Sequence, residues 1–547
     1  MAKETTAFET MLTKAIKKST NKLSMQRKEF GKNVGGINDS TQITSVRDFE
    51  ALDIHNVRLI PTGGIQKRKG YYVVNTASLV GSGTITGVFN YLRFTGNSDL
   101  IVCVNSGSVA NKIYKKDAGT NTFTSITPSG TWAGGDVTFA VSNDILMIAS
   151  DGGSNILQWD GSATACTDLN TATAPLAEVV TDWNRHAVAL KIPARGSNFE
   201  ISHQGNSTQW RNSDRFPTDR QTVGATSLLG KLYVFTTDRM YAVSGNDRDN
   251  LSMLPVRRSV EGTNQRSIVN VANRNLIVWP WRGNFYEFDG TNTKIISNRL
   301  ERPLANTSDF FNVNQSLFDN IQGVNIASES RVSFLIAARN KTQNTLVLNY
   351  HYDLRTEDPK TKQSIGAWTV DEYDRNFAYL AVSVEDEQEV LYAGDYDGHL
   401  CRLDVGDADG DSSEDANDGN AIASRYQTGP YHGGMPDVTK RWREIIPIVG
   451  QTSSGTVTIS TAENWAGSFI TADTVALTTG GFASYWGVSK WGEDLWGAAI
   501  SVIKRLSLSN RSEALSIKFS DSSKDPAWRI DTWVLRFQVL PGLRRFP

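Results

Sequence analysis

The sequence has few cysteines and no long apolar stretch. Its three cysteines, Cys103, Cys166 and Cys401, lie far apart, so we expect neither a disulfide framework nor a cysteine-type zinc site. Such cysteine usage is typical of a chain made in a reducing compartment. No apolar run approaches the roughly 18 residues of a membrane-spanning helix. The N-terminus lacks an apolar core followed by small residues, so we expect no signal peptide.

The sequence also lacks a charge excess and a recognisable catalytic motif. The 56 Lys and Arg nearly balance the 58 Asp and Glu, and the formal charge of -2 gives the whole chain no strong attraction for nucleic acid. It contains no GxSxG, Walker or HExxH pattern, and its six histidines are scattered without metal-ligand spacing. Abundant Asp and Glu leave a glycosidase pair open, but nothing singles one out. The sequence therefore predicts a protein that is not an enzyme and carries no cofactor.

What the sequence does contain is a repeated unit of strand, turn and strand. The stretch "RNLIVWPWRGNFYEFDG" at residues 274–290 predicts strands at 276–279 and 285–288, with a break at Pro280 and Gly283. Seven such pairs recur, with first strands starting at Leu100, Ile145, Ala187, Leu232, Leu276, Val332 and Val390. These starts are 45, 42, 45, 44, 56 and 58 residues apart. A period near 44 lies within the ~40–45 residues of a four-stranded propeller blade, and the longer steps are consistent with loop insertions.

These repeats predict an all-β fold built around a β-propeller at residues 80–405. A four-stranded sheet has two apolar faces that it cannot bury alone, whereas sheets packed around an axis bury them against each other. We expect about seven blades, with six as the alternative. Turns such as "QWDGSA" and "FDGTNT" are typical of connections between antiparallel strands.

The segments outside the propeller differ in composition. Residues 1–34 carry eight Lys and Arg against three Glu, a net charge of +5, and predict a basic N-terminal arm that is either solvated or docked on a partner or nucleic acid. Residues 35–79 are expected to pack on the propeller or on the C-terminal domain. Residues 406–422 are acidic and predict a linker or exposed loop. Residues 423–547 alternate apolar and polar side chains and predict a β-sandwich.

The acidic segment is also a candidate metal site. Asp407, Asp409 and Asp411 resemble the first half of a calcium loop. Gly410 comes before the position at which that pattern needs its glycine, and no Glu closes the loop. A solvated acidic loop is therefore the main interpretation, and bound calcium is the alternative.

Two further sets of residues are candidates for binding. Three tryptophans that each precede a glycine either pack at strand ends or form a stacking surface for a sugar or a partner. They are Trp486, Trp491 and Trp496. The basic run between Gly64 and Tyr71 is either a solvated turn beside an edge strand or a contact for phosphates. It consists of Lys67, Arg68 and Lys69.

The segment at residues 35–72 resembles the opening of tail proteins from short-tailed bacteriophages. Their pattern is a Gly-Gly start, an acidic "ea-d--Nvr" middle and a "G----R-GY" close. The matching positions are Gly35, Gly36, Glu50, Ala51, Asp53, Asn56, Val57, Arg58, Gly64, Arg68, Gly70 and Tyr71. The end of the chain is similar to their "G-RR" close, with Gly542, Arg544 and Arg545. The stretch "HYDLRT…GAWTV" at residues 351–370 resembles their repeated blade element.

The family is the nozzle, or tail tubular protein B-like, component of short-tailed phages. The resemblance implies a structural virion protein of the tail, made in the host cytoplasm, whose ring of six copies extends the DNA ejection channel and retains the genome. It implies an adaptor or portal-proximal ring, fibres or spikes, and transient genomic DNA as partners, with no membrane span. The candidates for contact with DNA or a partner are Lys67, Arg68, Lys69, Arg544 and Arg545. A glycan-binding or glycan-cleaving propeller of the virion is the alternative.

Overall fold

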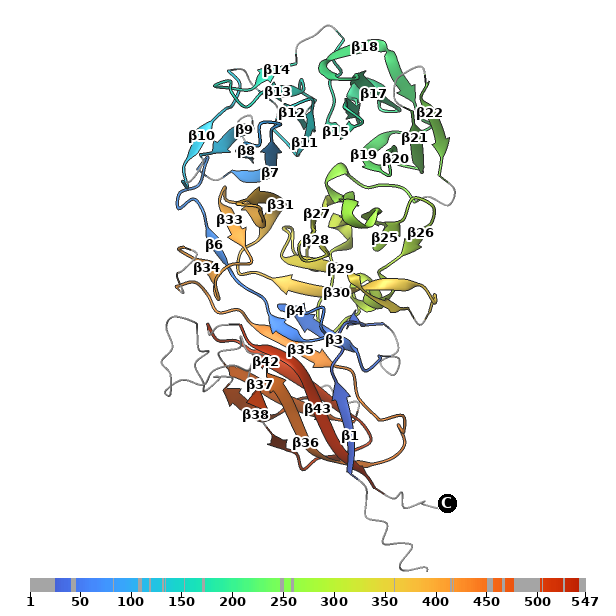
Figure 1. The fold of residues 1–547 in the computed structure, drawn as a ribbon, viewed down its shortest axis with the longest axis vertical. Coiled ribbons are helices and arrows are strands. Elements are labelled where there is room, and N and C mark those ends of the chain that lie inside the picture. The colour runs from blue at the N-terminus through green and yellow to red at the C-terminus, as the bar shows by residue number, and fades with distance from the viewer. Residues whose placement is uncertain are drawn as a thin grey trace, which may run out of the picture.

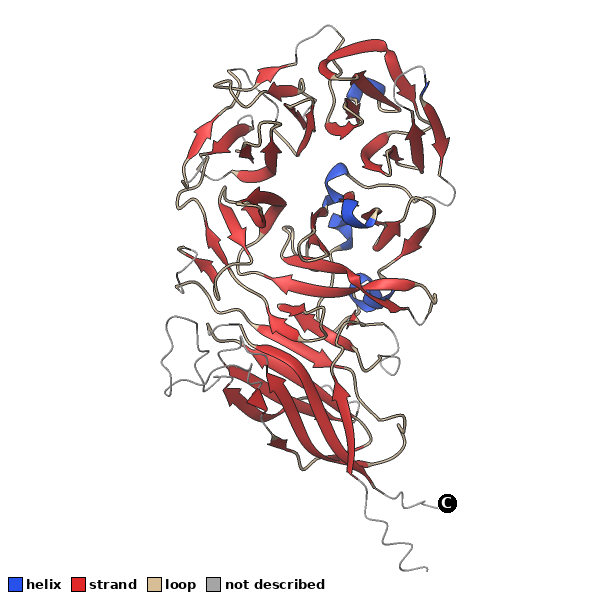
Figure 2. Cartoon of the chain, viewed as in Figure 1, coloured by secondary structure: helices blue, strands red, loops and turns tan. Residues whose placement is uncertain are grey.

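The computed structural model describes most of the chain from residue 25 to residue 540. The residues in this range that it does not describe are 41–45, 82, 107–110, 118–119, 130–131, 133, 152, 170–172, 246–249, 257–259, 359, 414–415, 417, 450–455, 465–467, 477–501, 504 and 525–526. The molecule is elongated, with a ring of sheets at one end and a sandwich at the other (Figure 1). Its regular structure is almost entirely strand (Figure 2).

Five four-stranded antiparallel sheets follow one another along the chain as blades of the ring. The first two are β7 (Thr84–Leu92), β8 (Ser98–Asn105), β9 (Lys112–Lys116) and β10 (Phe123–Ser125), then β11 (Val137–Ser142), β12 (Ile145–Ser150), β13 (Leu157–Trp159) and β14 (Thr167–Asp168). The next two are β15 (Val179–Trp183), β16 (His186–Leu190), β17 (Asn198–His203) and β18 (Asn206–Pro217), then β19 (Thr222–Leu228), β20 (Lys231–Thr236), β21 (Met240–Ser244) and β22 (Ser252–Pro255). The fifth is β23 (Val269–Val271), β24 (Leu276–Trp281), β25 (Asn284–Phe288) and β26 (Thr293–Ile295).

A five-stranded sheet closes the ring by combining distant parts of the chain. It consists of β31 (Phe377–Glu385), β32 (Gln388–Asp395), β33 (Leu400–Leu403), β6 (Tyr71–Val73) and β34 (Asp409–Asp411). Strand β6 comes from the N-terminal segment and pairs antiparallel with β33, with Val73 opposite Cys401. The strands that precede and follow the other blades therefore meet in one sheet.

A ten-stranded sheet runs from the ring into the sandwich. Its propeller part is β27 (Gln322–Ile326), β28 (Arg331–Ile336), β29 (Leu346–Glu357) and β30 (Ser364–Glu372). Beyond β30 follow β3 (Glu50–His55), β35 (Ser424–Thr428), β42 (Leu515–Asp521), β37 (Thr456–Glu463) and β38 (Ile470–Ala476), while β2 (Gly36–Ile37) pairs with β3. The first four strands fill a blade position, and the rest form one layer of the sandwich.

The predicted propeller is confirmed. The innermost strands β7, β11, β15, β19, β23, β27 and β31 contact one another in that order, and β31 contacts β7. Six of these strands belong to sheets confined to the propeller, and the remaining position belongs to the shared ten-stranded sheet. All seven predicted strand starts fall in the second strand of their sheets. The predicted break at Pro280 is wrong, because Pro280 lies inside β24 opposite Phe285 and the turn is at Arg282 and Gly283.

Apolar clusters fill the spaces between adjacent blades, as the argument from two apolar faces predicts. Ile101 and Cys103 of the first blade pack in one cluster with Leu146 and Ile148 of the second. Similar clusters join each later pair of neighbours around the ring. One larger cluster continues from the fifth blade through the ten-stranded sheet into the sandwich. The two domains therefore share part of their core.

The second layer of the sandwich is an eight-stranded sheet. It contains β39 (Val502–Ile503), β36 (Lys440–Val449), β43 (Arg529–Val539), β5 (Ile65–Lys67) and β4 (Val57–Leu59), with β1 (Met25–Phe30), β40 (Leu506–Ser507) and β41 (Arg511–Ser512) paired to its members. Its residues Trp442, Trp533 and Phe537 pack in the same core as Tyr426 and Phe519 of the facing layer.

The N-terminal segment is divided between the two domains. Part of the predicted arm, residues 25–30, is strand β1, which pairs with β43 along its whole length. Residues 1–24 lie outside the described part of the chain. Residues 35–79, expected to pack on one domain or the other, supply strands to both. The arm prediction is therefore wrong for residues 25–30, because Phe30 packs in the sandwich core.

The described helices are short and lie in connections. They are α2 (Glu301–Leu304), η2 (Pro193–Arg195), η4 (Gln265–Ser267), η5 (Ala272–Arg274), η6 (Asn298–Leu300) and η7 (Gln315–Asn320). In the described part of the chain, no helix has the length and apolar character needed to cross a membrane.

Candidate functional site at the junction of propeller and sandwich

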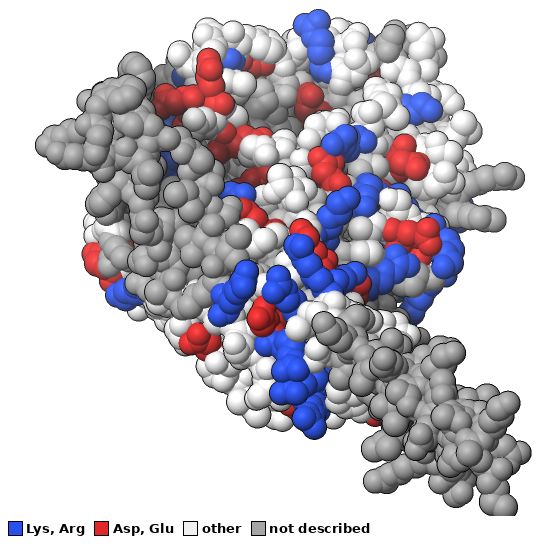
Figure 3. Space-filling view, turned by 60° about the horizontal axis from the view of Figure 1, so that its bottom comes forward, with Lys and Arg blue, Asp and Glu red and all other residues white. Residues whose placement is uncertain are grey.

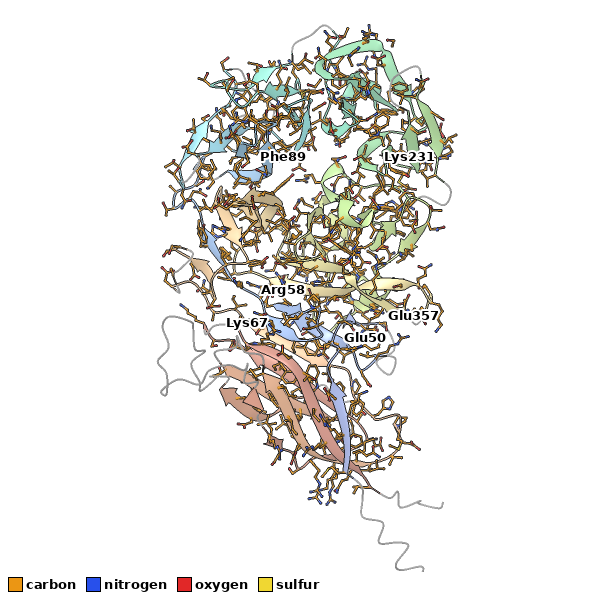
Figure 4. The ribbon with its side chains drawn as sticks, in the orientation of Figure 1. Glu50, Arg58, Lys67, Phe89, Lys231 and Glu357 are labelled. Carbon is orange, nitrogen blue, oxygen red and sulfur yellow. The ribbon has the colours of Figure 1, made fainter. Side chains whose placement is uncertain are left out.

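The candidate site is the junction, which we define as residues 50–71 together with the propeller and sandwich residues that they contact. Strands β3, β4 and β5 lie between the two domains, and β6 leads into the propeller (Figure 1). The side chains of Glu50, Arg58 and Lys67 lie at this level of the molecule (Figure 4). Most charged side chains of the junction bond to residues some 300 or more positions away in sequence.

Asn56 links three segments of the junction. Its backbone is left-handed, with φ of 55°, a conformation that asparagine tolerates better than most residues. Its side-chain oxygen accepts hydrogen bonds from Nε of Arg68 at 2.9 Å and from the backbone N–H of Glu372 at 2.8 Å. Its side-chain nitrogen donates to the carbonyl of Ala423 at 2.7 Å. One side chain thus joins the N-terminal segment to the propeller and to the start of the C-terminal domain.

Arg68 is fully buried and forms a two-pronged ion pair. Its two terminal nitrogens donate to the two carboxylate oxygens of Asp409 at 2.7 and 2.6 Å. The guanidinium also lies 3.8 Å from the ring centre of Tyr373 and donates to the carbonyl of Glu372. Burial alone would lower the pKa of Arg68, but the charge of Asp409 outweighs it and raises the pKa. Arg68 therefore remains charged and holds the acidic segment against the propeller.

Lys67, the preceding residue, points into the sandwich. Its ammonium donates to the carboxylate of Asp521 at 2.7 Å and to the carbonyl of Ser523 at 2.8 Å. The side chains of Lys67 and Asp521 are 1% and 4% exposed. Lys67 is the last residue of β5 and Arg68 directly follows it, and these consecutive cations bind opposite sides of the junction.

Arg58 belongs to a second buried network on the propeller side. It donates to the carboxylates of Asp371 and Asp404, and the bond to Asp404 is 3.0 Å. Arg331 donates to the other oxygen of Asp404 at 2.5 Å, and Asn349 donates to Asp371 at 2.7 Å. Burial alone would raise the pKa of Asp371, but Arg58 and then Arg68 outweigh it and lower the pKa.

His351 is the titratable group most affected by this network. Burial, and then the charges of Arg331 and Arg58, lower its pKa from 6.5 to about 3. Its Nε2 lies 3.2 Å from the hydroxyl of Thr369. The imidazole is therefore neutral at physiological pH.

Two glycines of the junction have no room for a side chain. A Cβ on Gly70 would lie 1.7 Å from the carbonyl oxygen of Ala408. A Cβ on Gly36 would lie 2.5 Å from the backbone nitrogen of Trp368, and Gly36 has a φ of +71°. Both positions allow the N-terminal segment to approach another backbone closely.

A cleft of about 610 Å³ opens beside these networks. It lies between the segment from β4 to β5 and the propeller residues near 328–330 and 351–354. Its lining includes the charged residues Arg58, Lys67, Arg68, Lys69 and Asp404 and the neutral His351. Arg58, Lys67 and Arg68 are each held by a carboxylate, whereas Lys69 is exposed. The arrangement fixes the relative position of the two domains.

The structure corrects the prediction that the basic run at residues 67–69 contacts DNA or a partner. Lys67 and Arg68 are 1% exposed and paired inside the molecule, so they do not present charge to a phosphate. Only Lys69 of the three lies on the surface.

The contacts of Asp407, Asp409 and Asp411 argue against the alternative of bound calcium. Both carboxylate oxygens of Asp409 accept from Arg68, and Asp411 accepts from the backbone of Gly419 at 2.8 Å. Asp407 accepts a longer bond, 3.4 Å, from the backbone of Ala527. Among the described residues, no group of three or more metal-ligating side chains is placed to hold an ion. The solvated-loop interpretation fails as well for Asp409 and Asp411, which are buried within β34.

Five candidate residues lie outside the described part of the chain. They are Trp486, Trp491, Trp496, Arg544 and Arg545. The predictions of a stacking surface and of a terminal contact with DNA or a partner stay predictions.

Sequence reasoning missed the acidic partners of the junction. Asp371 is the penultimate residue of β30, Asp521 is the last residue of β42, and Asp404 directly follows β33. Many polar residues occupy such positions near strand ends. A weak signal existed for Arg331, a charge that opens the buried strand "RVSFLI". A buried charge requires a partner, but the sequence does not say which carboxylate provides it.

Comparisons with known proteins do not assign this chain to a family. No family model matches the chain, and no curated protein matches it. YCF48 from Cyanidioschyzon merolae aligns with a TM-score of 0.38 and 10% identity, over 61% of this chain and 98% of YCF48. BBS1N, from a complex with ARL6DN, aligns with a TM-score of 0.37 and 12% identity, over 62% of this chain and 97% of BBS1N.

A third similar structure covers more of the present chain. The extracellular domain of the hybrid two-component system BT4673 from B. thetaiotaomicron aligns with a TM-score of 0.38 and 11% identity. The alignment spans 75% of this chain and 48% of that domain. All three are β-propeller proteins, and similarity at this level carries no argument about what the present chain does.

Proposed function

We propose that this chain is a structural protein of a bacteriophage virion, the nozzle or tail tubular protein B-like component of a short-tailed phage. Six copies form a ring at the end of the tail. The ring extends the DNA ejection channel and retains the packaged genome until ejection. It docks below an adaptor or portal-proximal ring, seats fibres or spikes, and contacts genomic DNA only transiently.

One observation supports this proposal above the others: several residues that carry the family resemblance connect the propeller to the sandwich. Asn56, Arg58 and Arg68 bond across it, and Gly36 and Gly70 allow close backbone approach. The pattern is therefore tied to one particular way of joining a propeller to a sandwich.

The architecture suits a ring subunit. A closed ring made of identical copies needs two different faces that contact each other head to tail. A propeller and a sandwich in one elongated molecule supply such faces (Figure 1). The junction connects the two domains by ion pairs and a shared sheet, and a ring of defined copy number requires such a firm connection. The role needs no catalytic residues.

Immunogold electron microscopy on virions tests the proposal directly. An antibody raised against this chain is expected to label the distal end of the tail, and an antibody against the capsid is the control. Label confined to side appendages would contradict the nozzle role and favour a receptor-binding one. An absence of label on intact and opened particles would exclude a virion protein.

A further inference from the structure

The outer face of the eight-stranded sheet carries arginines in an unusual arrangement. In antiparallel sheets, directly opposite residues lie on the same face with their Cβ atoms about 5 Å apart. Arg27 of β1 is directly opposite Arg536 of β43. Arg441 of β36 is directly opposite Arg511 of β41. Like charges in such positions repel, so the sheet tolerates two unfavourable pairs.

The two pairs form one cluster. Gln538 of β43 is directly opposite Arg441, and it lies two residues from Arg536 on the same strand. Both arginine pairs therefore lie on the same face of the sheet, in adjacent rows of side chains that run across the strands. This face is the outer one, because Trp533 and Phe537, which alternate with these residues, point into the sandwich core. We call Arg27, Arg441, Arg511 and Arg536 the arginine cluster. Lys and Arg side chains gather at the sandwich end of the molecule (Figure 3).

The described carboxylates compensate the cluster only in part. Arg536 forms an ion pair with Glu444 at 3.1 Å. Arg27 forms one with Glu29 at 3.2 Å, and the side chains of Arg27 and Glu29 are both exposed. Neither Arg441 nor Arg511 forms an ion pair with a carboxylate in the described part of the chain. The face therefore has guanidinium groups available for an external anion.

We propose that the arginine cluster binds the sugar–phosphate backbone of nucleic acid without reading its sequence. Guanidinium groups match phosphate oxygens in a two-pronged geometry and are favoured where planar recognition of phosphate matters. An anion bound between opposed arginines also removes their mutual repulsion. The residues that share these two rows with the arginines are Met25, Gln538, Glu444 and Ser507. None of them has an aromatic ring on which a base could stack.

The ends of the described chain favour a long polyanion over a single small anion. Strand β1 begins at Met25, directly opposite Gln538 near the end of β43. The sequence before β1, residues 1–24, contains five Lys and two Glu, and the sequence after residue 540 contains Arg544 and Arg545. Further positive charge therefore directly precedes β1 and follows β43 in the sequence, and a polyanion interacts with more positive charges than a small anion does. This inference does not depend on the tail role proposed above.

Binding of the full chain to a labelled DNA duplex of about 20 base pairs, measured by fluorescence anisotropy over a salt series, tests the proposal. We expect binding at about 50 mM salt and a loss of affinity with salt whose logarithmic slope is about 3 to 4. The double variant Arg441→Gln/Arg511→Gln is expected to weaken binding roughly tenfold and to lower the slope by about 2. Duplexes of different sequence are expected to bind equally.

Two controls separate a charge effect from a folding effect. Arg441→Lys/Arg511→Lys retains both charges and is expected to retain most of the slope. Arg211→Gln/Arg220→Gln removes two exposed charges from the third blade and is expected to leave binding unchanged. Equal losses in the cluster and third-blade variants, or an absence of binding by the parent chain at low salt, would overturn the proposal. Displacement of DNA by polyglutamate at equal charge would overturn it too and assign the face to an acidic protein.

Discussion

Arg68 and Lys69 show how little a local sequence says about the role of a charge. They are consecutive cations, yet Arg68 is 1% exposed and paired with Asp409, while Lys69 is exposed. A basic run is usually solvated, and nothing within the run distinguishes its members. The distinction comes from Asp409, 341 positions away. The role of each cation is therefore decided by tertiary structure.

Substitution of these two residues tests the difference between them. Arg68→Met leaves the carboxylate of Asp409 buried without its partner, so we expect the free energy of unfolding to fall by about 3–5 kcal/mol. Lys69→Gln removes a solvated charge and is expected to change it by less than about 0.5 kcal/mol. Urea unfolding followed by circular dichroism measures both. Similar values for the two variants would show that the Arg68 pair does not stabilise the junction.

His351 makes the stability of the protein depend on pH in a defined range. Its pKa is lowered from 6.5 to about 3 in the folded protein, so below 6.5 the unfolded chain binds a proton that the folded chain does not. Its contribution to stability is complete above pH 6.5 and is lost as the pH falls toward 3. Between pH 6.5 and about pH 5 the loss should reach about 2 kcal/mol.

The variant His351→Gln isolates this effect. We expect its free energy of unfolding to fall less than that of the parent chain between pH 7 and about pH 5, because it has no imidazole to protonate. His203 is exposed, and His203→Gln serves as the matched control with unchanged pH dependence. If the parent and His351→Gln lose stability in parallel, protonation of other groups dominates the acid sensitivity.

At the scale of elements, the sequence predicts the local units well and the distant pairings poorly. The hairpin of β24 and β25 is encoded within about 20 residues, by apolar residues in the strands and turn residues between them. Because similar hairpins recur along the chain, the sequence alone reveals the blades. Strand β6 pairs with β33 across more than 300 residues, and β1 pairs with β43 across more than 500. Such pairings leave no periodic signal, because either strand alone could pair with many others. The junction therefore had to be seen in the structure.

Strand β1 provides a prediction at this scale. Phe30 at its end stacks on Trp533 with ring centres 5.5 Å apart and meets Tyr431 edge-on at 5.2 Å. Loss of a buried Phe typically costs about 3–5 kcal/mol. A chain lacking residues 1–30 is therefore expected to unfold at a clearly lower urea concentration than one lacking residues 1–24. Comparison of the two truncations isolates the strand, and equal midpoints would contradict its role in the sandwich.

At the scale of the whole molecule, the connections between domains predict one cooperative unfolding transition. Large proteins with separate domains usually unfold in several steps. Here the ten-stranded sheet belongs to both domains, since β3 pairs with β30 of the propeller and with β35 of the sandwich. The largest apolar cluster also spans both. Neither domain can lose its strands without exposing the core of the other.

Hydrogen exchange followed by mass spectrometry over a urea series measures this coupling. Peptides from β12 in the propeller and β43 in the sandwich are expected to lose protection at the same urea concentration. Arg58→Met, which removes the ion-pair partner of the buried Asp371 at the junction, is expected to separate the two transitions. Arg274→Gln breaks only the more exposed pair with Asp353 and should leave them coincident. Two separate transitions in the parent chain would mean that the shared sheet does not couple the domains, and the rigid subunit assumed for the ring would lose its physical basis.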